Sequence, residues 1–257
     1  MGKGNILNEL HRKASGEILV FTDADILLEP DAITNLVAPF GDPDVGCVIG
    51  NLRLSGLSIE KIYWNYRKTI RKAEQKLFGT TVGVSGALWA IREELFTPFP
   101  EKQLADDLWL PLRIGKLGYR TAYQESAVAR GDTGTSLKNE ISRRIRIVHN
   151  NVQVMKRYLP PLDWFGFQYM SRKLLWHLMP LGYLGLLFSN IFLLQTPLFS
   201  WIFALQLIFY ATGLGAIYWN LSKPWSLAGF AVGMQWALIK GTVAGLVNRP
   251  VEWEVVR

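Results

Sequence analysis

Two carboxylates near the N-terminus stand at a spacing that could do chemistry. The apolar segment from Glu17 to Thr22 runs directly into Asp23 and Asp25, which are separated by one residue. A short apolar run of this kind predicts a strand buried on both faces of a parallel sheet. In open α/β sheets the ligand lies beyond the carboxyl ends of the strands, which is where both carboxylates fall. Such a pair can hold Mg²⁺ or Mn²⁺ and, through the cation, a diphosphate.

A second acidic pair and a group of arginines are further candidates. Asp106 and Asp107 stand near the start of a helix predicted over 103–117, where the helix dipole favours negative charge. They could act on a substrate or could merely cap that helix. The arginines at 143, 144 and 146 could bind phosphate or could supply positive charge at a membrane surface.

The elements that must position these residues follow an α/β pattern. The spacing of apolar residues and the turn residues between them predict helices over 5–14, 32–39, 58–78 and 103–117, and strands over 17–22, 45–51, 84–91 and 119–129. A basic amphipathic helix is expected over 141–158 and an aromatic-rich one over 163–173. Sheet and helices therefore occupy the first part of the chain.

The rest of the chain is apolar. No Asp, Glu, Lys or Arg occurs from Leu174 to Ser222, a gap of 49 residues, whereas about 20 apolar residues suffice to cross a bilayer. Spans are expected at about 175–195 and 198–219. The stretch 225–247 contains Gln235 and Lys240, so it is either one tilted span or a broken, re-entrant segment.

Charge and cysteine content narrow the compartment. The net charge is +7, with Lys and Arg concentrated over 138–157 and again at Arg172 and Lys173, before the first apolar span. This pattern predicts a multi-pass protein of the cell (inner or plasma) membrane whose soluble part is cytoplasmic. No nucleic-acid-binding motif accompanies the basic residues, so no nucleic-acid partner is expected. A single cysteine, Cys47, excludes an internal disulfide and is consistent with a reducing compartment.

Taken in order, these pieces resemble the family 2 inverting glycosyltransferases, in particular the membrane-anchored cellulose, hyaluronan and poly-N-acetylglucosamine synthases. The segment from Ala14 to Asp25 resembles the family's sugar-nucleotide strand with its metal-binding DxD motif. The segment from Val84 to Arg92 is similar to its acceptor-site strand, and Ala105-Asp-Asp-Leu108 stands where the family has a Thr-Glu-Asp-type motif. Arg143-x-x-Arg146 stands where many members have Gln-x-x-Arg-Trp.

The resemblance implies a fold, a reaction and roles for residues. It implies an incomplete GT-A (Rossmann-like) catalytic domain over 1–150, amphipathic interface helices over 151–174 and a transmembrane region over 175–257. The reaction would move a sugar from a nucleoside-diphosphate donor, such as a UDP-sugar, to a lipid or glycan acceptor at the cytoplasmic face. The implied site residues are Asp23 and Asp25 for the metal, Asp107 with Asp106 for catalysis, Arg143, Arg146 and Lys3 for the donor diphosphate, and Ser85 and Gly86 for the acceptor.

The chain departs from the family pattern in two respects. Arg143 replaces the Gln of the Gln-x-x-Arg-Trp motif and Ile147 replaces its Trp, which puts long-chain synthesis in question. The family also has a further βαβ half before the position of Lys3, which grips the nucleoside, whereas only 22 residues precede Asp23. We therefore expect a fragment, a truncated gene product or a split protein that needs a partner subunit.

Two other functions remain open from the sequence. The chain could be an accessory membrane subunit without donor binding. An apolar strand followed by DxD also occurs in phosphatases, in which the first Asp is the nucleophile, but Leu27 stands where that pattern has Thr or Val.

Overall fold

The computed structural model describes residues 3–55, 59–100, 105–132, 136–158, 160–219, 225–249 and 251. It divides into two compact units. The sheet unit comprises Met1–Thr133 with Val154–Met170, and the helical unit comprises Gly134–Gln153 with Ser171–Arg257. The predicted boundary at residue 150 falls inside a helix, α5 (Leu137–Met155), most of which belongs to the helical unit.

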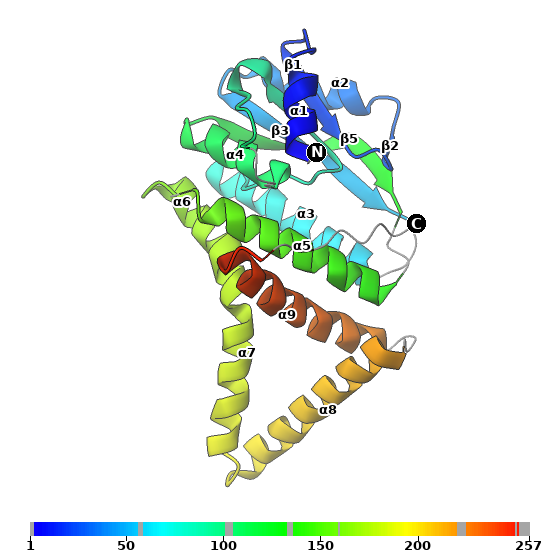
Figure 1. Cartoon of the computed structure of the whole chain (residues 1–257), viewed down its shortest axis with the longest axis vertical. Coiled ribbons are helices and arrows are strands. Elements are labelled where there is room, and N and C mark those ends of the chain that lie inside the picture. Colours follow the sequence, from blue (N-terminus) through cyan, green and yellow to red (C-terminus); the bar gives the residue numbers. More distant parts are fainter. Residues whose placement is uncertain are drawn as a thin grey trace. The chain divides into compact units, whose positions relative to one another are not determined.

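The sheet unit is built on five strands (Figure 1). They are β1 (Ile18–Thr22), β2 (Leu27–Leu28), β3 (Val45–Leu54), β4 (Leu88–Arg92) and β5 (Arg120–Gly131), in the spatial order β1-β4-β3-β5-β2. Only the β3–β5 pair is parallel, and the other three pairs are antiparallel. The sheet is therefore mixed, with its central pair parallel.

The prediction that 17–22 forms a strand buried on both faces of a parallel sheet is wrong about the burial and the pairing of that strand. The strand exists as β1, but it stands first in the sheet order and pairs antiparallel with β4. Its residues are only partly buried, and Val20 is 38% exposed. An apolar run in the sequence predicts that a strand forms, but the burial of that strand depends on which elements pack against it.

Helices cover both faces of the sheet. They are α1 (Lys3–His11), α2 (Ala32–Val37) with the short η1 (Ala38–Gly41), α3 (Ile59–Phe78), η2 (Glu93–Leu95), α4 (Asp106–Lys116) and α6 (Trp164–Tyr169). Adjacent residues of one strand point to opposite faces. Thus Val48 packs in the core beneath α2, whereas Ile49 packs with Trp89 in the core beneath α4.

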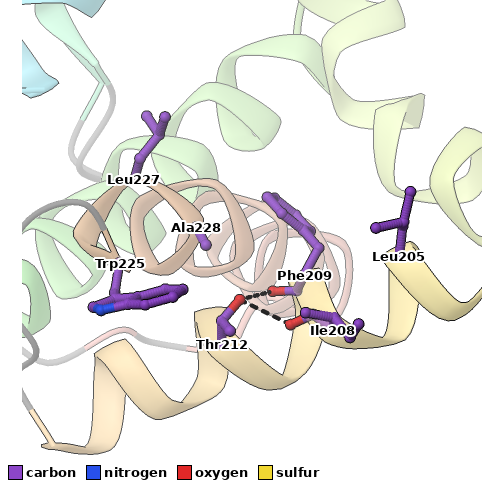
Figure 2. A pocket seen from close by; sticks show the side chains of 7 residues that line it. All are labelled: Leu205, Ile208, Phe209, Thr212, Trp225, Leu227 and Ala228. Carbon is purple, nitrogen blue, oxygen red and sulfur yellow. Dashed lines mark hydrogen bonds between the residues drawn. The ribbon is translucent and has the colours of Figure 1, made fainter.

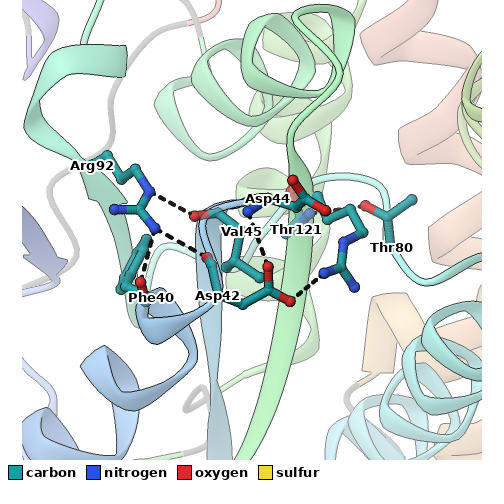
Figure 3. A network of polar contacts seen from close by, with 8 residues as sticks. Phe40, Asp42, Asp44, Val45, Thr80, Arg92 and Thr121 are labelled. Atoms are coloured by element: carbon teal, nitrogen blue, oxygen red, sulfur yellow. Dashed lines mark hydrogen bonds and ion pairs between the residues drawn. The ribbon is translucent and has the colours of Figure 1, made fainter.

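A polar network ties the edge of the sheet where β3 and β5 begin (Figure 3). Arg92 donates hydrogen bonds to the backbone carbonyl oxygens of Phe40, Asp42 and Val45. The Asp42 carboxylate in turn pairs with Arg120 and accepts a hydrogen bond from the Asp44 backbone N–H. These bonds fix the loop that enters β3, and so they set the register of the two central strands.

The helical unit contains most of α5, the end of a π-helical turn η3 (Met170–Leu174), and the helices α7 (Leu175–Phe192), α8 (Pro197–Trp219) and α9 (Trp225–Leu246). In the part of the chain that the structure describes, three helices are long and apolar enough to cross a membrane, and they include α7, α8 and α9. The residue ranges agree with the predicted apolar segments to within a few residues.

Within this unit, α7, α8 and α9 form a triangle (Figure 1). The turn at 193–196 joins α7 to α8, and Asn190 donates a hydrogen bond of 2.8 Å to Gln206 across that corner. At another corner His177 of α7 lies 2.9 Å from the Thr242 hydroxyl of α9. The third corner is packed through glycines, since a Cβ at Gly229 of α9 would lie 2.8 Å from the Ala216 Cβ of α8.

Candidate active site

One lysine and two aspartates from three distant segments meet in the sheet unit. The Lys3 ammonium, on α1, lies 3.3 Å from the Asp23 carboxylate after β1 and 2.9 Å from the Asp106 carboxylate at the start of α4. The side chain of Asp106 is 13% exposed and that of Asp23 is 44% exposed. Three of the residues that the resemblance singled out are therefore in direct contact.

The turn over 84–87 lies against the same carboxylates. The Thr22 hydroxyl donates a hydrogen bond of 2.9 Å to the Ala87 carbonyl, and the Val84 N–H donates one of 2.9 Å to the Asp107 carbonyl. A Cβ at Gly86 would lie 3.0 Å from Asp23 Oδ2, so a side chain there would crowd the carboxylate. The site is thus a junction of β1, this turn and α4.

The predicted strand over 84–91 begins later than expected. The ladder starts at Leu88, and Val84 to Ala87 form the turn that faces Asp23. Ser85 is buried, and its hydroxyl has no hydrogen-bond partner within the described ranges. Ser85 and Gly86, which the resemblance assigns to the acceptor, therefore lie on a turn, where backbone and side chain are both free of the sheet ladder.

Helix α1 positions Lys3 although none of its residues is buried. Asn8 donates a hydrogen bond of 2.9 Å to the Phe99 carbonyl and accepts one of 2.8 Å from the Phe99 N–H. His11 stacks on Phe96 with ring centroids 3.9 Å apart and lies 2.8 Å from the Glu93 carboxylate. These polar and ring contacts, together with the partly buried Leu7 that packs against the core, hold the lysine at the site.

The electrostatics of the site favour an additional cation. Burial raises the pKa of Asp23 above its usual value; Lys3 opposes this shift, and the carboxylates of Asp106 and Asp25 add to it. Burial lowers the pKa of Lys3, but Asp106 and Asp23 more than offset this effect, so its pKa is raised. Two carboxylates thus contact one ammonium group, and a third, that of Asp25, repels Asp23, which leaves an excess of negative charge.

Neither aspartate of α4 caps the helix with its side chain. The N-cap residue is Ala105, and no side chain makes a capping hydrogen bond there. Asp106 and Asp107 occupy the first turn, where the helix dipole stabilises their charge, and Asp106 is directed to Lys3. The simple capping explanation therefore does not account for this pair.

The residues present fit a divalent cation bound partly by its substrate. No cluster of three or more His, Cys, Asp or Glu side chains suited to a metal occurs among the described residues. Asp23 and the exposed Asp25 supply two carboxylates, and Mg²⁺ commonly takes one or two carboxylates together with substrate phosphates and water. Asp25 exerts a repulsive effect on Asp23, which a bound cation would remove.

A polar cavity of about 330 Å³ adjoins Asp25, and sequence reasoning missed it. Asp25, Arg53, Ser55, Arg130 and Asp132 line it together with Leu27, Leu54 and Gly131. Arg53 and Arg130 stand opposite one another in the parallel β3–β5 pair, an arrangement of like charges that is unfavourable unless an anion is near. Arg130 pairs with Glu29 at 2.6 Å.

The signal for these arginines lies in the sequence. Each ends an apolar strand, as Asp23 does, so the rule that places ligands beyond strand ends would have found them. Arg143 and Arg146 lie on α5 in the helical unit, where Arg143 pairs with Glu140 at 2.6 Å. Their action on a donor diphosphate stays a prediction.

Comparison with known proteins places these residues in a sequence family. The model of the family described as "Glycosyltransferase like family 2" matches residues 1–150. An O-antigen chain rhamnosyltransferase of Salmonella typhimurium is 31% identical over 140 residues, which cover 49% of this chain and 45% of that protein. A poly-beta-1,6-N-acetyl-D-glucosamine synthase of Staphylococcus aureus is 24% identical over 165 residues, covering 61% of this chain and 40% of that protein. The chain therefore spans less than half the length of these relatives.

A solved structure matches nearly the whole chain. The mannosyltransferase PcManGT of Pyrobaculum calidifontis, in complex with GDP-Man and Mn²⁺, superposes with a TM-score of 0.73 at 25% identity. The match covers 97% of this chain and 68% of that one. The similarity supports a GT-A-like α/β fold and extends over the apolar helices as well as the sheet.

Proposed function

Because the chain belongs to glycosyltransferase-like family 2, we propose that it is a membrane-bound inverting glycosyltransferase. It moves a sugar from a nucleoside-diphosphate donor, such as a UDP-sugar, to a lipid or glycan acceptor. The observation that carries this proposal is the convergence of Lys3, Asp23, Gly86 and Asp106 from four distant segments at one end of β1.

Asp23 and Asp25 are proposed to hold Mg²⁺ or Mn²⁺ against the donor diphosphate. The excess of negative charge around Asp23 supports this role, because a cation would relieve it. The metal, when bound, neutralises charge that develops on the diphosphate leaving group. Lys3, which bridges Asp23 and Asp106, supplies a positive charge at the same place.

Asp107 is the proposed general base, with Asp106 orienting the acceptor. The acceptor hydroxyl oxygen forms a bond to the anomeric carbon while its proton passes to the Asp107 carboxylate. The bond from the anomeric carbon to the diphosphate oxygen breaks on the opposite face, so the configuration inverts. Ser85 and Gly86 lie on the turn that is bonded to the Asp107 carbonyl, which supports a role for this turn in holding the acceptor.

Arginines are proposed to bind the anionic oxygens of the substrates. A guanidinium suits a diphosphate because it donates two parallel hydrogen bonds. Arg143 and Arg146 are assigned to the donor diphosphate by the family pattern. The opposed pair Arg53 and Arg130, in the cavity beside Asp25, is a second place where an anionic oxygen would be stabilised.

The helical unit is proposed to anchor the enzyme in the cell membrane with its sheet unit in the cytoplasm. The exposed apolar side chains of α7 and α8 and the basic residues before them support this orientation. An acceptor attached to a lipid, or a glycan growing at the membrane, would meet the sheet unit at that surface.

The test is calorimetric titration of the detergent-purified chain with UDP and with GDP, in the presence and absence of Mn²⁺. We expect metal-dependent binding of one nucleotide that is lost in Asp25→Asn and kept in Asp31→Asn, which removes an equivalent exposed charge from the start of α2. Absence of binding to a chain that is folded by circular dichroism would contradict donor binding and favour the accessory-subunit alternative.

A further inference from the structure

Helix α9 has the length and composition of a third membrane span, but its neighbours in the helical unit are not those of a spanning helix. It packs along α5 through a row of small residues spaced four apart, Gly229, Gly233, Ala237, Gly241 and Gly245. The share of its apolar window that is buried is 39%, compared with 11% in α8. The position of α9 relative to the membrane therefore depends on which element covers this row of small residues.

Successive contacts between α9 and α5 involve residues progressively closer to the C-terminus of both helices. A Cβ at Gly229 would lie 3.0 Å from Leu137, one at Gly233 would lie 2.5 Å from Ile141, and one at Gly245 would lie 2.7 Å from Val152. Between them, a Cβ at Gly241 would lie 2.7 Å from both the Ile145 carbonyl oxygen and the Val148 Cβ. The two helices therefore run side by side and parallel over nearly their whole length.

Helix α5 cannot lie in hydrocarbon. Within the stretch that contacts α9 it carries five charged side chains, Lys138, Glu140, Arg143, Arg144 and Arg146, as well as His149 and several amides. Charged side chains are expensive at the centre of a bilayer, and five on one helix exclude a transmembrane position. Because α9 is in contact with α5 along its length, α9 could cross the bilayer only if the charged helix α5 entered the bilayer with it.

The ends of α9 lead to the same conclusion independently. Its first turns pack on the C-terminal part of α8, at Gly213 and Ala216. Its last turns pack on the N-terminal part of α7, where Thr242 meets His177. If α7 and α8 cross the bilayer as a hairpin with its turn at 193–196, these two ends are on the same side. A helix that joins them returns to the side from which it started.

We infer that α9 lies along the cytoplasmic surface of the membrane and does not cross it, with its outer face in contact with lipid at the interface. This inference rests on the proposed membrane anchoring. The exposed residues Trp236, Ile239, Val243 and Leu246 recur every three or four positions on that face, and Lys240 is exposed among them. Tryptophan and lysine beside aliphatic side chains are typical of helices in the interface.

An apolar recess between α8 and the start of α9 fits the same arrangement (Figure 2). It has a volume of about 340 Å³ and is lined by Leu205, Ile208, Phe209, Thr212, Trp225, Leu227 and Ala228. The Thr212 hydroxyl shares its single proton between the carbonyls of Ile208 and Phe209, so it has no donor left for the recess. Such a lining accepts an acyl chain that rises beside a spanning helix beneath an interfacial one.

The consequence is a two-span topology. The chain after α9, at residue 251, is on the same side of the membrane as the sheet unit, and among the described residues after α6 it is the turn at 193–196 that reaches the far side. A spanning α9 would place residue 251 on the far side with that turn.

The experiment is cysteine labelling in intact cells with a membrane-impermeant maleimide. The only native cysteine, Cys47, is buried and is removed as Cys47→Ala. Single cysteines are then introduced at exposed positions as Lys13→Cys in the sheet unit, Gln195→Cys in the turn and Arg249→Cys after α9. A fourth variant, Lys240→Cys, reports on α9 itself.

We expect Gln195→Cys to react from outside the cell, whereas the other three react only after the membrane is permeabilised. Labelling of Arg249→Cys together with Gln195→Cys, and not with Lys13→Cys, would overturn the inference and make α9 a span. Identical labelling of Gln195→Cys and Lys13→Cys would show that α7 and α8 do not cross the bilayer. That outcome would overturn both this inference and the membrane anchoring, whereas the nucleotide titration tests the enzymatic proposal separately.

Discussion

The sheet unit and the helical unit use the same apolar residue types in opposite ways. In the sheet unit Trp89, Ile49 and Ile91 are at most 1% exposed. In the helical unit Leu186 is 58% exposed, Phe192 is 84% exposed and Trp201 is 72% exposed. The first pattern is that of a protein that folds in water, and the second is consistent with helices that lie in a membrane.

The difference indicates which interactions stabilise each unit. The sheet unit is stabilised by the burial of its apolar side chains against one another. Its polar site residues lie apart from this core, at the end of β1. The helices α7 and α8 bury few side chains and are held at their corners by hydrogen bonds such as Asn190–Gln206. Helix α9 stands between the two patterns, since one face packs on α5 and the other is exposed.

Removing the proposed base should have the largest effect on activity and little effect on the fold. We expect Asp107→Asn to lower sugar transfer by about 10²–10⁴-fold, the range that general bases contribute, while the circular dichroism spectrum and thermal midpoint stay close to those of the parent. The rate is measured with the nucleotide sugar identified by titration. Asp31→Asn serves as the control, and unchanged transfer in Asp107→Asn would remove this residue from the mechanism.

Truncation of a tryptophan should lower the free energy of unfolding much more in the sheet unit than in the helical unit. Trp89 is 1% exposed and stacks on Phe21 with centroids 4.1 Å apart, so Trp89→Ala should cost about 3–5 kcal/mol of unfolding free energy. The matched change Trp201→Ala, on exposed α8, should stay within about 0.5 kcal/mol. Denaturant titration in detergent measures both. Equal losses would contradict the contrast between a buried core and a helix with exposed apolar side chains.

Filling the small-residue row of α9 should destabilise the helical unit where α9 packs closely on α5. In Gly241→Leu the new side chain meets the Ile145 carbonyl and Val148, and overpacking of this kind typically costs about 1–3 kcal/mol. Gly182→Leu on α7 meets nothing within 4 Å and should be neutral or slightly stabilising, because leucine favours helix more than glycine does. Thermal unfolding compares the pair, and equal midpoints would argue against close α5–α9 packing.

The smallest expected effect is a pH-dependent gain from removing one site carboxylate. Burial and neighbouring carboxylates raise the pKa of Asp23 in the folded chain above its ordinary value of 3.8, so its ionisation opposes folding at neutral pH. Asp23→Asn should therefore slightly raise the thermal midpoint at pH 7. The gain should vanish below pH 3.8, where the carboxyl is protonated in folded and unfolded chains alike.

The outcome in the other direction is equally informative. A lower midpoint for Asp23→Asn at pH 7 would mean that the ion pair with Lys3 outweighs the burial of the carboxylate. The site would then be a stabilising cluster rather than one that sacrifices stability for a cation, as functional sites commonly do.

Much of the chain follows from local sequence. Apolar periodicity placed the strands β1, β3 and β5 and the helices α2, α3 and α7–α9 to within a few residues, because strand and helix repeats are local properties. The carboxylates at 23, 25, 106 and 107 were visible as residue types at a spacing. The two-residue strand β2 and the turn at 84–87 were not predicted, since pairing and not composition defines them.

By itself, the sequence determined which segments are helices and strands, which are apolar enough for a membrane, and which residues are capable of the chemistry. Only the tertiary structure decided that Lys3 bridges Asp23 and Asp106, that Arg53 faces Arg130, and that α9 runs along α5. Hydropathy identifies both α8 and α9 as candidate membrane spans, because it is summed over the residues of one helix at a time. Whether a helix crosses a membrane depends also on what it touches, and Ile141 and Val148 are about 90 positions away in the chain from the glycines that they cover.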